Sequence, residues 1–363
     1  MRTGSVFCQP FKIFMVNKLA LFLKTKHIGD SIILTSAIEA LPKEYMVDVL
    51  CFKESEAIFK MHPMVRNVFV VPRHLKGMAK LRHYQEILKT MRTSRYDFLA
   101  QFSDDWRGAF LARILNVPLS VARASKKRPS FWSNSFKQIA KTTVTTRPAA
   151  EQDVDLLRKV GLFNQVSAPP YFVDVPHEVN AKVGEWLKLN FNQDSTEKLV
   201  LIHAPARWKF KGISNLTWAG LIDVLHERGW AVVLGGASSD AAFNEDLSLL
   251  CKRAPKIVHD FSIQESAALI KKSDLLVSID SMSIHLASAV QTPVVAIFGP
   301  TDEKIWSPWQ VAHKVVALSE DDSPSFACRP CGLDGCAGSK VSQCLMAVEA
   351  KQILSAIDDL LGS

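Results

Sequence analysis

The sequence predicts an α/β protein built from two domains, each with a doubly wound, parallel sheet. Its 363 residues exceed what one ordinary hydrophobic core needs, so two domains of roughly 150–200 residues are expected. Short apolar segments alternate with helical patterns along the whole chain, which is typical of repeated βα units. Near the middle, Gln165–Tyr171 contains two consecutive prolines that cannot continue a helix, and this predicts a linker.

The first half begins with a strand and a helix. Leu19–Leu23 is a continuous apolar run typical of a buried parallel strand, and apolar residues then recur at helical spacing within Ser31–Leu41. Further apolar runs predict strands at Val47–Cys51, Asn67–Val71 and Asp97–Gln101.

The second half repeats this alternation. Its apolar runs predict strands at Leu199–His203, Trp230–Leu234, Lys256–His259, Asp274–Ile279, Pro293–Phe298 and Lys314–Leu318. Helices are expected between them, for example at Trp218–Arg228 and Ser262–Lys271, with a last helix at Ala347–Leu361. A boundary near residue 175 then gives domains of residues 1–175 and 176–345, with residues 346–363 as a C-terminal helix that could pack back on the first domain.

Composition and cysteine usage indicate a globular cytoplasmic protein. Hydrophobic residues make up 48% of the chain and charged residues 22%, and no apolar run reaches the ~18 residues that a membrane span needs. The N-terminal segment, in which Met15 is a second candidate start, is interrupted by Lys12 and Lys18. No small-residue cleavage site follows it, so we expect no signal peptide. Seven irregularly spaced cysteines do not form the even framework of a secreted protein.

Positive charge is concentrated in the first half. Residues 1–178 contain 27 Lys and Arg against 15 Asp and Glu, whereas residues 179–363 contain 17 against 21. This excess favours an anionic partner, which could be a nucleic acid, an anionic membrane surface or a phosphorylated acceptor. A solvated surface that happens to be basic is the alternative.

A polar hexapeptide, Asp280–His285, follows the predicted strand Asp274–Ile279 and opens a helix. Open α/β sheets bind ligands at the carboxyl ends of their strands, and backbone N–H groups at a helix N-terminus favour phosphate. The segment supplies a carboxylate, two hydroxyls and an imidazole at this point. We therefore expect a phosphate-bearing ligand here.

Three other polar loops follow predicted strands. In Lys24–Asp30, Asp30 is placed to cap the next helix or to act as a general base, and the two roles are compatible. The three cations of Arg207–Lys211 suit a diphosphate clamp, with an ordinary basic surface loop as the alternative. In Gly235–Asp240, paired glycines allow a ligand to approach the backbone, and Asp240 could accept hydrogen bonds from a ribose.

Together these segments resemble glycosyltransferase family 9, the ADP-heptose:lipopolysaccharide heptosyltransferases of Gram-negative bacteria. The resemblance rests on KTKHIGD at 24–30, the Arg/Lys loop, DSMSIH at 280–285, FGPTD at 298–302 and IWSPW at 305–309. It runs from about residue 19 to the C-terminal helix, and it is most similar to the heptosyltransferase III branch.

This resemblance implies the GT-B fold, in which two Rossmann-like domains face each other across a cleft. Residues 1–175 would bind the lipid-linked acceptor, and residues 176–345 the nucleotide sugar. Asp30 matches the family's catalytic base, Lys211 matches a lysine on the phosphates of the sugar donor, and Asp240 falls near the acidic residue at the adenosine ribose. The remaining residues that would bind the sugar donor are Arg207, Asp280, Ser281, Met282 and His285.

The resemblance further implies an inverting transfer of heptose from ADP-heptose to the lipid A-core acceptor, at the inner core of lipopolysaccharide. No cofactor and no divalent metal are required for catalysis in this scheme. Met282 stands where relatives often have Gly or Ala, and Pro205 and Ala206 replace threonines, so a different nucleotide sugar is an alternative. A catalytically idle paralogue that binds a nucleotide or lipid is the alternative outside the enzymes.

The expected location is cytoplasmic and peripheral to the inner membrane, without a nucleic-acid partner. Lys126–Trp132 mixes cations with aromatic residues and could contact phosphorylated lipid A core at the anionic inner leaflet, with a solvated loop as the alternative. Four C-terminal cysteines leave three options open, namely a structural metal, reduced buried thiols or disulfides. They are Cys328, Cys331, Cys336 and Cys344.

Overall fold

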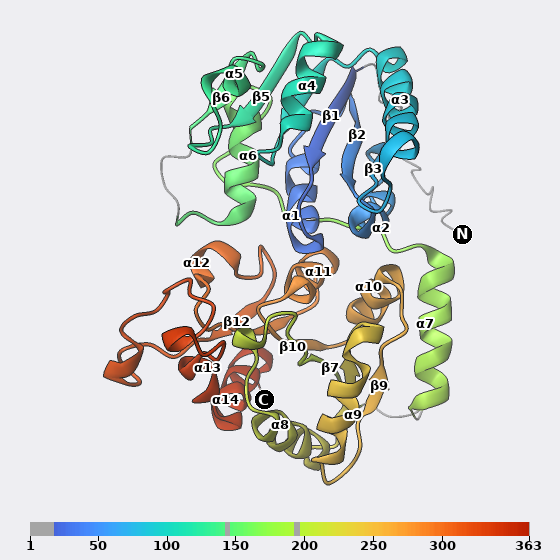
Figure 1. Ribbon diagram of the computed structural model, residues 1–363. Coiled ribbons are helices and arrows are strands. Elements are labelled where there is room, and N and C mark those ends of the chain that lie inside the picture. The colour runs from blue at the N-terminus through green and yellow to red at the C-terminus, as the bar shows by residue number, and fades with distance from the viewer. Residues whose placement is uncertain (1–17, 142–145, 192–196, 363) are drawn as a thin grey trace, which may run out of the picture.

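The computed structural model describes residues 18–141, 146–191 and 197–362, which form two lobes, one above the other in Figure 1. Each lobe is built around a six-stranded sheet whose paired strands are all parallel. Helices lie on the faces of both sheets. The predicted α/β class with two doubly wound parallel sheets is confirmed, whereas Met15 lies outside the described residues.

The first sheet has the strand order β3-β2-β1-β4-β5-β6. Its strands are β1 Lys18–Lys24, β2 Tyr45–Phe52, β3 Val65–Val71, β4 Phe98–Gln101, β5 Leu119–Arg123 and β6 Gln138–Ala140. Its helices are α1 Ile28–Glu39, α2 Glu56–Lys60, α3 Gly77–Ser94, α4 Trp106–Leu115, α5 Ser130–Ser133 and α6 Ala149–Lys159. The sequence predicted the first four strands but missed β5 and β6, in which Ser120, Arg123 and Gln138 interrupt the apolar pattern.

The second sheet has the strand order β12-β11-β10-β7-β8-β9. Its strands are β7 Leu199–His203, β8 Ala231–Gly235, β9 Lys256–Val258, β10 Leu275–Ile279, β11 Val294–Ile297 and β12 His313–Val316. The helices that follow the first lobe are α7 His177–Asn190, α8 Asn215–Glu227, α9 Ala241–Leu249, α10 Ile263–Lys272, α11 Met282–Val290, α12 Glu303–Trp306, α13 Gln343–Met346 and α14 Ala350–Leu361. All six predicted strands are confirmed; β7 has the predicted bounds, and the ends of the other five differ by at most two residues.

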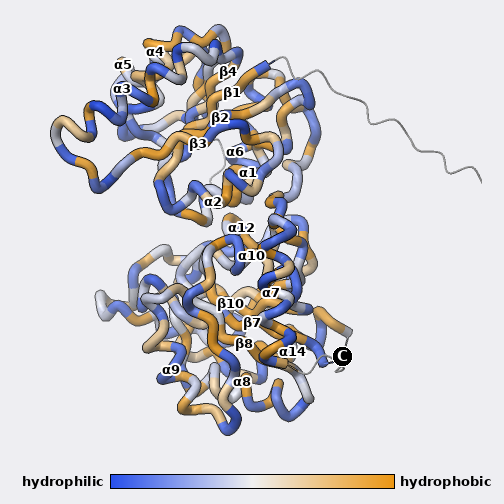
Figure 2. Tube along the Cα trace, turned by 90° about the vertical axis from the view of Figure 1, so that its right-hand side faces the viewer, coloured by the Kyte–Doolittle hydropathy of each residue, from blue (hydrophilic) through white to orange (hydrophobic). Residues whose placement is uncertain are grey.

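The central strands are buried on both faces, as expected when helices cover both sides of a parallel sheet. Every residue of β10 is buried, and so are all but the first residue of β1. Figure 2 shows these strands as hydrophobic segments inside each lobe. None of the described helices combines the length and the apolar character needed to cross a membrane.

The lobes are in contact through α1 and α11, whose apolar residues belong to one continuous core cluster. The predicted linker lies beside this contact and is bound to both lobes. The carbonyl oxygen of Pro169 accepts a hydrogen bond from Ser36 Oγ of α1 at 2.6 Å and another from Trp309 Nε1 at 3.0 Å. Nearby Ala168 and Tyr171 are buried. The predicted linker is therefore an ordered, packed segment, while the boundary near residue 175 stays a prediction.

The C-terminal helix α14 packs on the second sheet, so the expectation that it returns to the first domain is wrong. Its buried residues Ile353 and Ile357 join the core around β7, β10 and α8. The Arg228 guanidinium, which follows α8, pairs with Asp358 at 2.5 Å. The apolar stripe of α14 thus packs against the second sheet and α8 of its own lobe.

Candidate active site

A cleft of about 1050 Å³ lies between the lobes, at the carboxyl ends of strands from both sheets. The first lobe contributes the loop after β1 and the start of α1. The second lobe contributes the segments that follow β7, β8 and β10. Because β1 with β4, and β7 with β10, are the pairs at which strand order reverses, both sheets present their topological switch points to the cleft.

Asp30 lies in the first turn of α1 and lines the cleft. The helix begins at Ile28 with His27 as its N-cap residue, so the prediction that Asp30 occupies the cap position is wrong by three residues. Its carboxylate still lies in the first turn, near the positive end of the helix dipole. Asp30 therefore keeps the position that a general base in the cleft requires.

Gly29 lets the start of α1 approach the start of α11. A Cβ atom built on Gly29 would lie 3.3 Å from His285 Cδ2 and 3.7 Å from the Met282 backbone. This close approach brings Asp30 of the first lobe beside the Asp280–His285 segment of the second. Two of the polar motifs identified in the sequence thus meet at one site.

Lys211 and Asp280 form an ion pair at the edge of the cleft. Lys211 Nζ donates to Asp280 Oδ2 at 2.5 Å, and both side chains are largely buried. They follow the neighbouring strands β7 and β10, whose ends lie side by side. The carboxylate therefore holds the ammonium group where an anionic ligand would meet it.

The N-terminus of α11 is organised by serine hydroxyls. Ser281 Oγ accepts from the Ser283 backbone N–H at 3.4 Å and lies 2.7 Å from Ser283 Oγ. Ser278 Oγ extends this chain, at 2.7 Å from Ser283 Oγ. The first N–H groups of a helix and its dipole favour an anion at this position. Ser281 is thus both the helix cap and part of the cleft surface.

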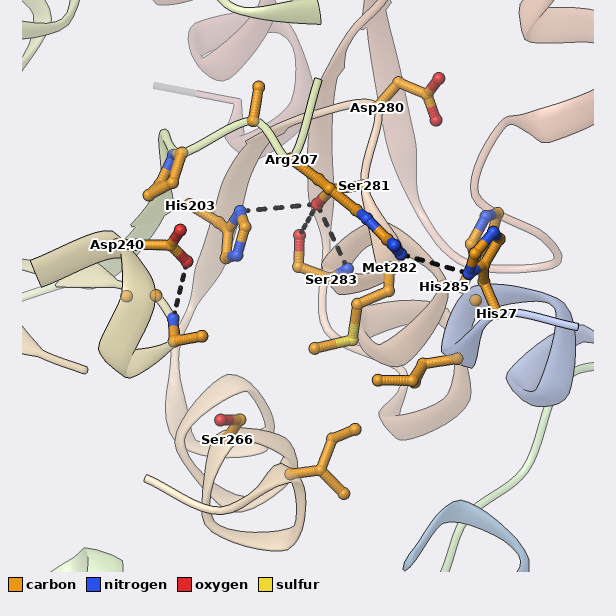
Figure 3. Close-up of a pocket in the computed structure, with 18 of the residues that line it drawn as sticks. His27, His203, Arg207, Asp240, Ser266, Asp280, Ser281, Met282, Ser283 and His285 are labelled. Atoms are coloured by element: carbon orange, nitrogen blue, oxygen red, sulfur yellow. Dashed lines mark hydrogen bonds between the residues drawn. The ribbon is translucent and has the colours of Figure 1, made fainter. Parts of the chain in front are cut away.

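His203 is a cleft residue that the sequence analysis missed. It ends β7, and its Nδ1 lies 3.5 Å from Ser281 Oγ (Figure 3). Burial lowers the pKa of His203, so its ring is neutral. The signal that could have found it is a polar residue closing an apolar strand at the ligand-binding edge, as in Asp280 after β10.

His285 is a buried imidazole in the second turn of α11. Its ring makes edge contacts with Tyr171 at 6.0 Å and Trp306 at 6.5 Å between centroids. Burial lowers the pKa of His285 to about 4, although nearby Asp280 and Asp30 oppose that shift. Within the described part of the chain, its Nδ1 atom has no hydrogen-bond partner. A neutral ring nitrogen is thus available beside both carboxylates.

Arg207 reaches across the cleft. Its Nη1 lies 3.2 Å from Nδ1 of His27, which belongs to the first lobe and which the sequence analysis also missed (Figure 3). The Met282 side chain points into the cleft in the same view. Asp240 lines the far side, where its Oδ2 accepts from the Ala237 backbone N–H at 2.8 Å. All eight predicted site residues therefore lie at this one cleft.

The C-terminal cysteines lie outside the cleft lining. Cys328, Cys331, Cys336 and Cys344 are all free thiols. Across the described ranges, no group of three or more His, Cys, Asp or Glu side chains is placed to hold a metal ion. Burial raises the pKa of the Cys344 thiol. A structural metal at these cysteines stays a prediction for which the described residues form no ready site.

Two doubly wound sheets that face each other across such a cleft form the GT-B fold. The family model "Glycosyltransferase family 9 (heptosyltransferase)" matches residues 84–332, and the chain belongs to this family. The predicted family, GT-B fold and transferase class are thereby confirmed.

Individual relatives cover nearly the whole chain. "Lipopolysaccharide heptosyltransferase 3" of Escherichia coli is 26% identical over an alignment of 352 positions, which covers 92% of this chain and 97% of that protein. The crystal structure of a family 9 glycosyl transferase from Veillonella parvula has a TM-score of 0.81 at 18% identity, covering 97% of this chain and 99% of that one. The E. coli heptosyltransferase WaaC with ADP-2-deoxy-2-fluoro heptose has a TM-score of 0.67 at 18% identity, covering 94% and 99%.

Proposed function

We propose that this enzyme transfers heptose from ADP-heptose to the inner core of lipopolysaccharide. The observation that carries the proposal is the cleft itself, in which Asp30 of one lobe faces Lys211, Arg207 and the N-terminus of α11 from the other. The family and the 26% identity to a lipopolysaccharide heptosyltransferase support heptose as the sugar. The relative crystallised with an ADP-heptose analogue supports ADP as the carrier.

In this mechanism Asp30 removes the proton from an acceptor hydroxyl, whose oxygen attacks the anomeric carbon of the heptose. The bond from that carbon to the β-phosphate oxygen breaks on the opposite face, so the configuration inverts. ADP leaves with additional negative charge, which Lys211, Arg207 and the N–H groups behind Ser281 stabilise. The scheme uses only groups of the chain.

Asp280 acts through Lys211 in this scheme. An unpaired carboxylate at a diphosphate site would repel the ligand, but the 2.5 Å pair with Lys211 neutralises it and fixes the ammonium group. On the other side of the switch point, Asp240 is placed for the ribose hydroxyls of the nucleotide. The Met282 side chain and Pro205 shape the cleft between these groups.

The experiment that tests the function combines the purified enzyme with ADP-heptose and a truncated core acceptor. We expect ADP release together with an acceptor whose mass has increased by one heptose. Transfer from another nucleotide sugar only would favour the alternative that Met282 and Pro205 suggest. Binding of ADP without transfer to any of a panel of core acceptors would instead favour an idle paralogue.

The first lobe offers a surface for the membrane that carries the lipid-linked acceptor. An aromatic patch of Trp106, Phe110 and Phe131 is exposed around α4 and α5, close to the carboxyl edge of the first sheet. Arg113 lies over the Phe131 ring at 4.2 Å and Arg128 over the Trp106 ring at 5.6 Å. Such a mixture suits the interface of an anionic membrane.

Within the predicted contact segment Lys126–Trp132, the structure corrects one residue. Trp132 is fully buried, and its Nε1 donates to the Asp105 carbonyl oxygen at 2.9 Å, so it cannot contact a lipid. Phe131, in contrast, is 61% exposed. We therefore assign the contact to the aromatic patch and the surrounding cations, with the enzyme peripheral to the cytoplasmic face of the inner membrane.

We expect the enzyme to float with anionic liposomes at low salt, and replacing both Phe110 and Phe131 by Ser should remove this binding. Each basic residue near an anionic surface adds roughly 1 kcal/mol, so the binding should also weaken at high salt. Leu249→Ser is the matched control, because Leu249 is 84% exposed on the second lobe. A wild-type protein that stays in the soluble fraction would contradict this assignment.

A further inference from the structure

The loop between β7 and α8 carries two aromatic side chains that the mechanism does not use. Trp208 is 53% exposed, although a large apolar ring is usually covered. Its ring is stacked on that of Phe210, with centroids 6.3 Å apart and an angle of 24° between the planes. The stack follows directly after Arg207, which lies over the Trp208 ring at 5.6 Å.

This aromatic stack forms one wall of a second hollow, of about 530 Å³. The lining residues are Arg207, Trp208, Lys209, Phe210, Asp334 and Lys340. Arg207 and Trp208 also line the main cleft, so the hollow continues the cleft outward. A molecule whose reacting end lies in the cleft can therefore extend into this hollow.

The position of the hollow separates it from the expected nucleotide position. Asp240 follows β8, on one side of the switch point between β7 and β10. Asp334 and Lys340 belong to the segment after β12, which lies at the other edge of the same sheet. Asp240 is not among the residues that line the hollow, so adenosine held at Asp240 leaves the hollow free for a different ligand.

The chemistry of the hollow suits a phosphorylated sugar. The flat faces of Trp208 and Phe210 can stack on the apolar C–H face of a pyranose ring. Besides Arg207, which serves the departing ADP in the proposed mechanism, Lys209 and Lys340 provide two positive charges against the single carboxylate of Asp334, which is paired with Lys340. The excess of cations favours a phosphate on or beside that sugar.

We propose that the Trp208–Phe210 stack is a subsite for a phosphorylated sugar unit of the acceptor oligosaccharide, next to the unit that receives the heptose. This inference rests on the proposed function for the identity of the acceptor. It adds a specificity site in the second lobe, which otherwise holds the sugar donor. The His27–Arg207 contact places this loop beside the Asp30 loop of the first lobe, where the acceptor hydroxyl reacts.

The test measures, by calorimetry, how tightly the full-length protein binds a deacylated, phosphorylated core oligosaccharide in the absence of sugar donor. We expect Trp208→Ala to weaken binding about tenfold. Lys209→Gln should weaken binding of this probe but not of its dephosphorylated form. Leu216→Ala is the matched control, because Leu216 is an exposed apolar residue at the start of α8, outside the hollow.

Steady-state kinetics distinguish this subsite from a general defect. Trp208→Ala should raise KM for the extended acceptor, with kcat and the KM for ADP-heptose unchanged. Unchanged binding of the phosphorylated probe by Trp208→Ala would overturn the subsite, as would an equal loss of ADP-heptose affinity. The binding measurement needs no turnover, so it tests the subsite independently of the proposed function. Failure to transfer heptose would refute the proposed function, whereas binding of the phosphorylated probe alone decides the subsite.

Discussion

At the scale of single residues, His285 shows how burial fixes protonation in the cleft. Its ring is enclosed by α11, by Tyr171 of the linker and by Trp306, and it faces Gly29 of the first lobe. Burial outweighs the attraction of Asp280 and Asp30 for a proton, and the pKa of His285 falls to about 4. The ring is therefore a neutral partner for a ligand at neutral pH, and not a cation.

This lowered pKa predicts a pH dependence of stability. In the unfolded chain His285 takes up a proton near its ordinary pKa of 6.5, whereas in the folded chain it does so only near 4. The unfolded state thus binds more protons between these values, and the free energy of unfolding decreases as pH falls through the window. We expect His285→Gln to lose less stability than the wild type between pH 6.5 and 4.5, measured by urea denaturation. Equal losses in both proteins would contradict this prediction.

The candidate site residues could be predicted from sequence because the ligand-binding residues of a parallel sheet lie at the carboxyl ends of its strands. Asp280 and Lys211 each follow a recognisable apolar strand, so their place at the sheet edge followed from local patterns. Their direct pairing could not be predicted, because it depends on which strands are neighbours in the sheet. His27 was missed for a similar reason, since only the assembled cleft shows that it contacts Arg207.

At the scale of elements, β1 is fixed to α6 by a buried ion cluster. Lys24 Nζ at the end of β1 donates to Asp153 Oδ2 at 2.7 Å, and Arg123 at the end of β5 donates to Asp153 Oδ1 at 2.7 Å. Lys24 is 5% exposed and Asp153 is 1% exposed. The cluster thus anchors the strand that leads into the Asp30 loop.

We expect Asp153→Ala to reduce the free energy of unfolding by about 3–5 kcal/mol, because it leaves the Lys24 ammonium group buried without its carboxylate. Denaturant unfolding measures this loss. The control is Asp359→Ala, which removes an exposed partner of Lys314 and should change stability little. Similar, small effects of the two substitutions would show that the buried cluster is not an anchor.

Prediction of the elements from sequence was reliable where the apolar runs were long. Residues such as those of β10 and β11 are buried on both faces, so the runs are continuous. The strand β6 consists of only Gln138–Ala140 at the edge of its sheet, and two of its three residues are only half-buried, so it has no continuous apolar run. The packing of α14 also could not be predicted, because its apolar stripe would fit any open apolar face.

At the scale of the whole molecule, the cleft depends on how the two lobes meet. The α1–α11 contact and the two hydrogen bonds to the Pro169 carbonyl set that relation. The sequence predicted two domains but not their mutual orientation, because the contacts involve residues more than 130 positions apart. The basic charge of the first half is consistent with an anionic, membrane-borne acceptor on that lobe.

The central claim is that the two lobes divide one reaction, with the base on the first lobe and the binding of the sugar donor on the second. The most direct measurement compares Asp30→Asn with the wild type for both ADP-heptose affinity and heptose transfer. We predict unchanged affinity with turnover reduced by at least ~10², the lower range for loss of a general base. Near-normal turnover by Asp30→Asn would contradict the claim.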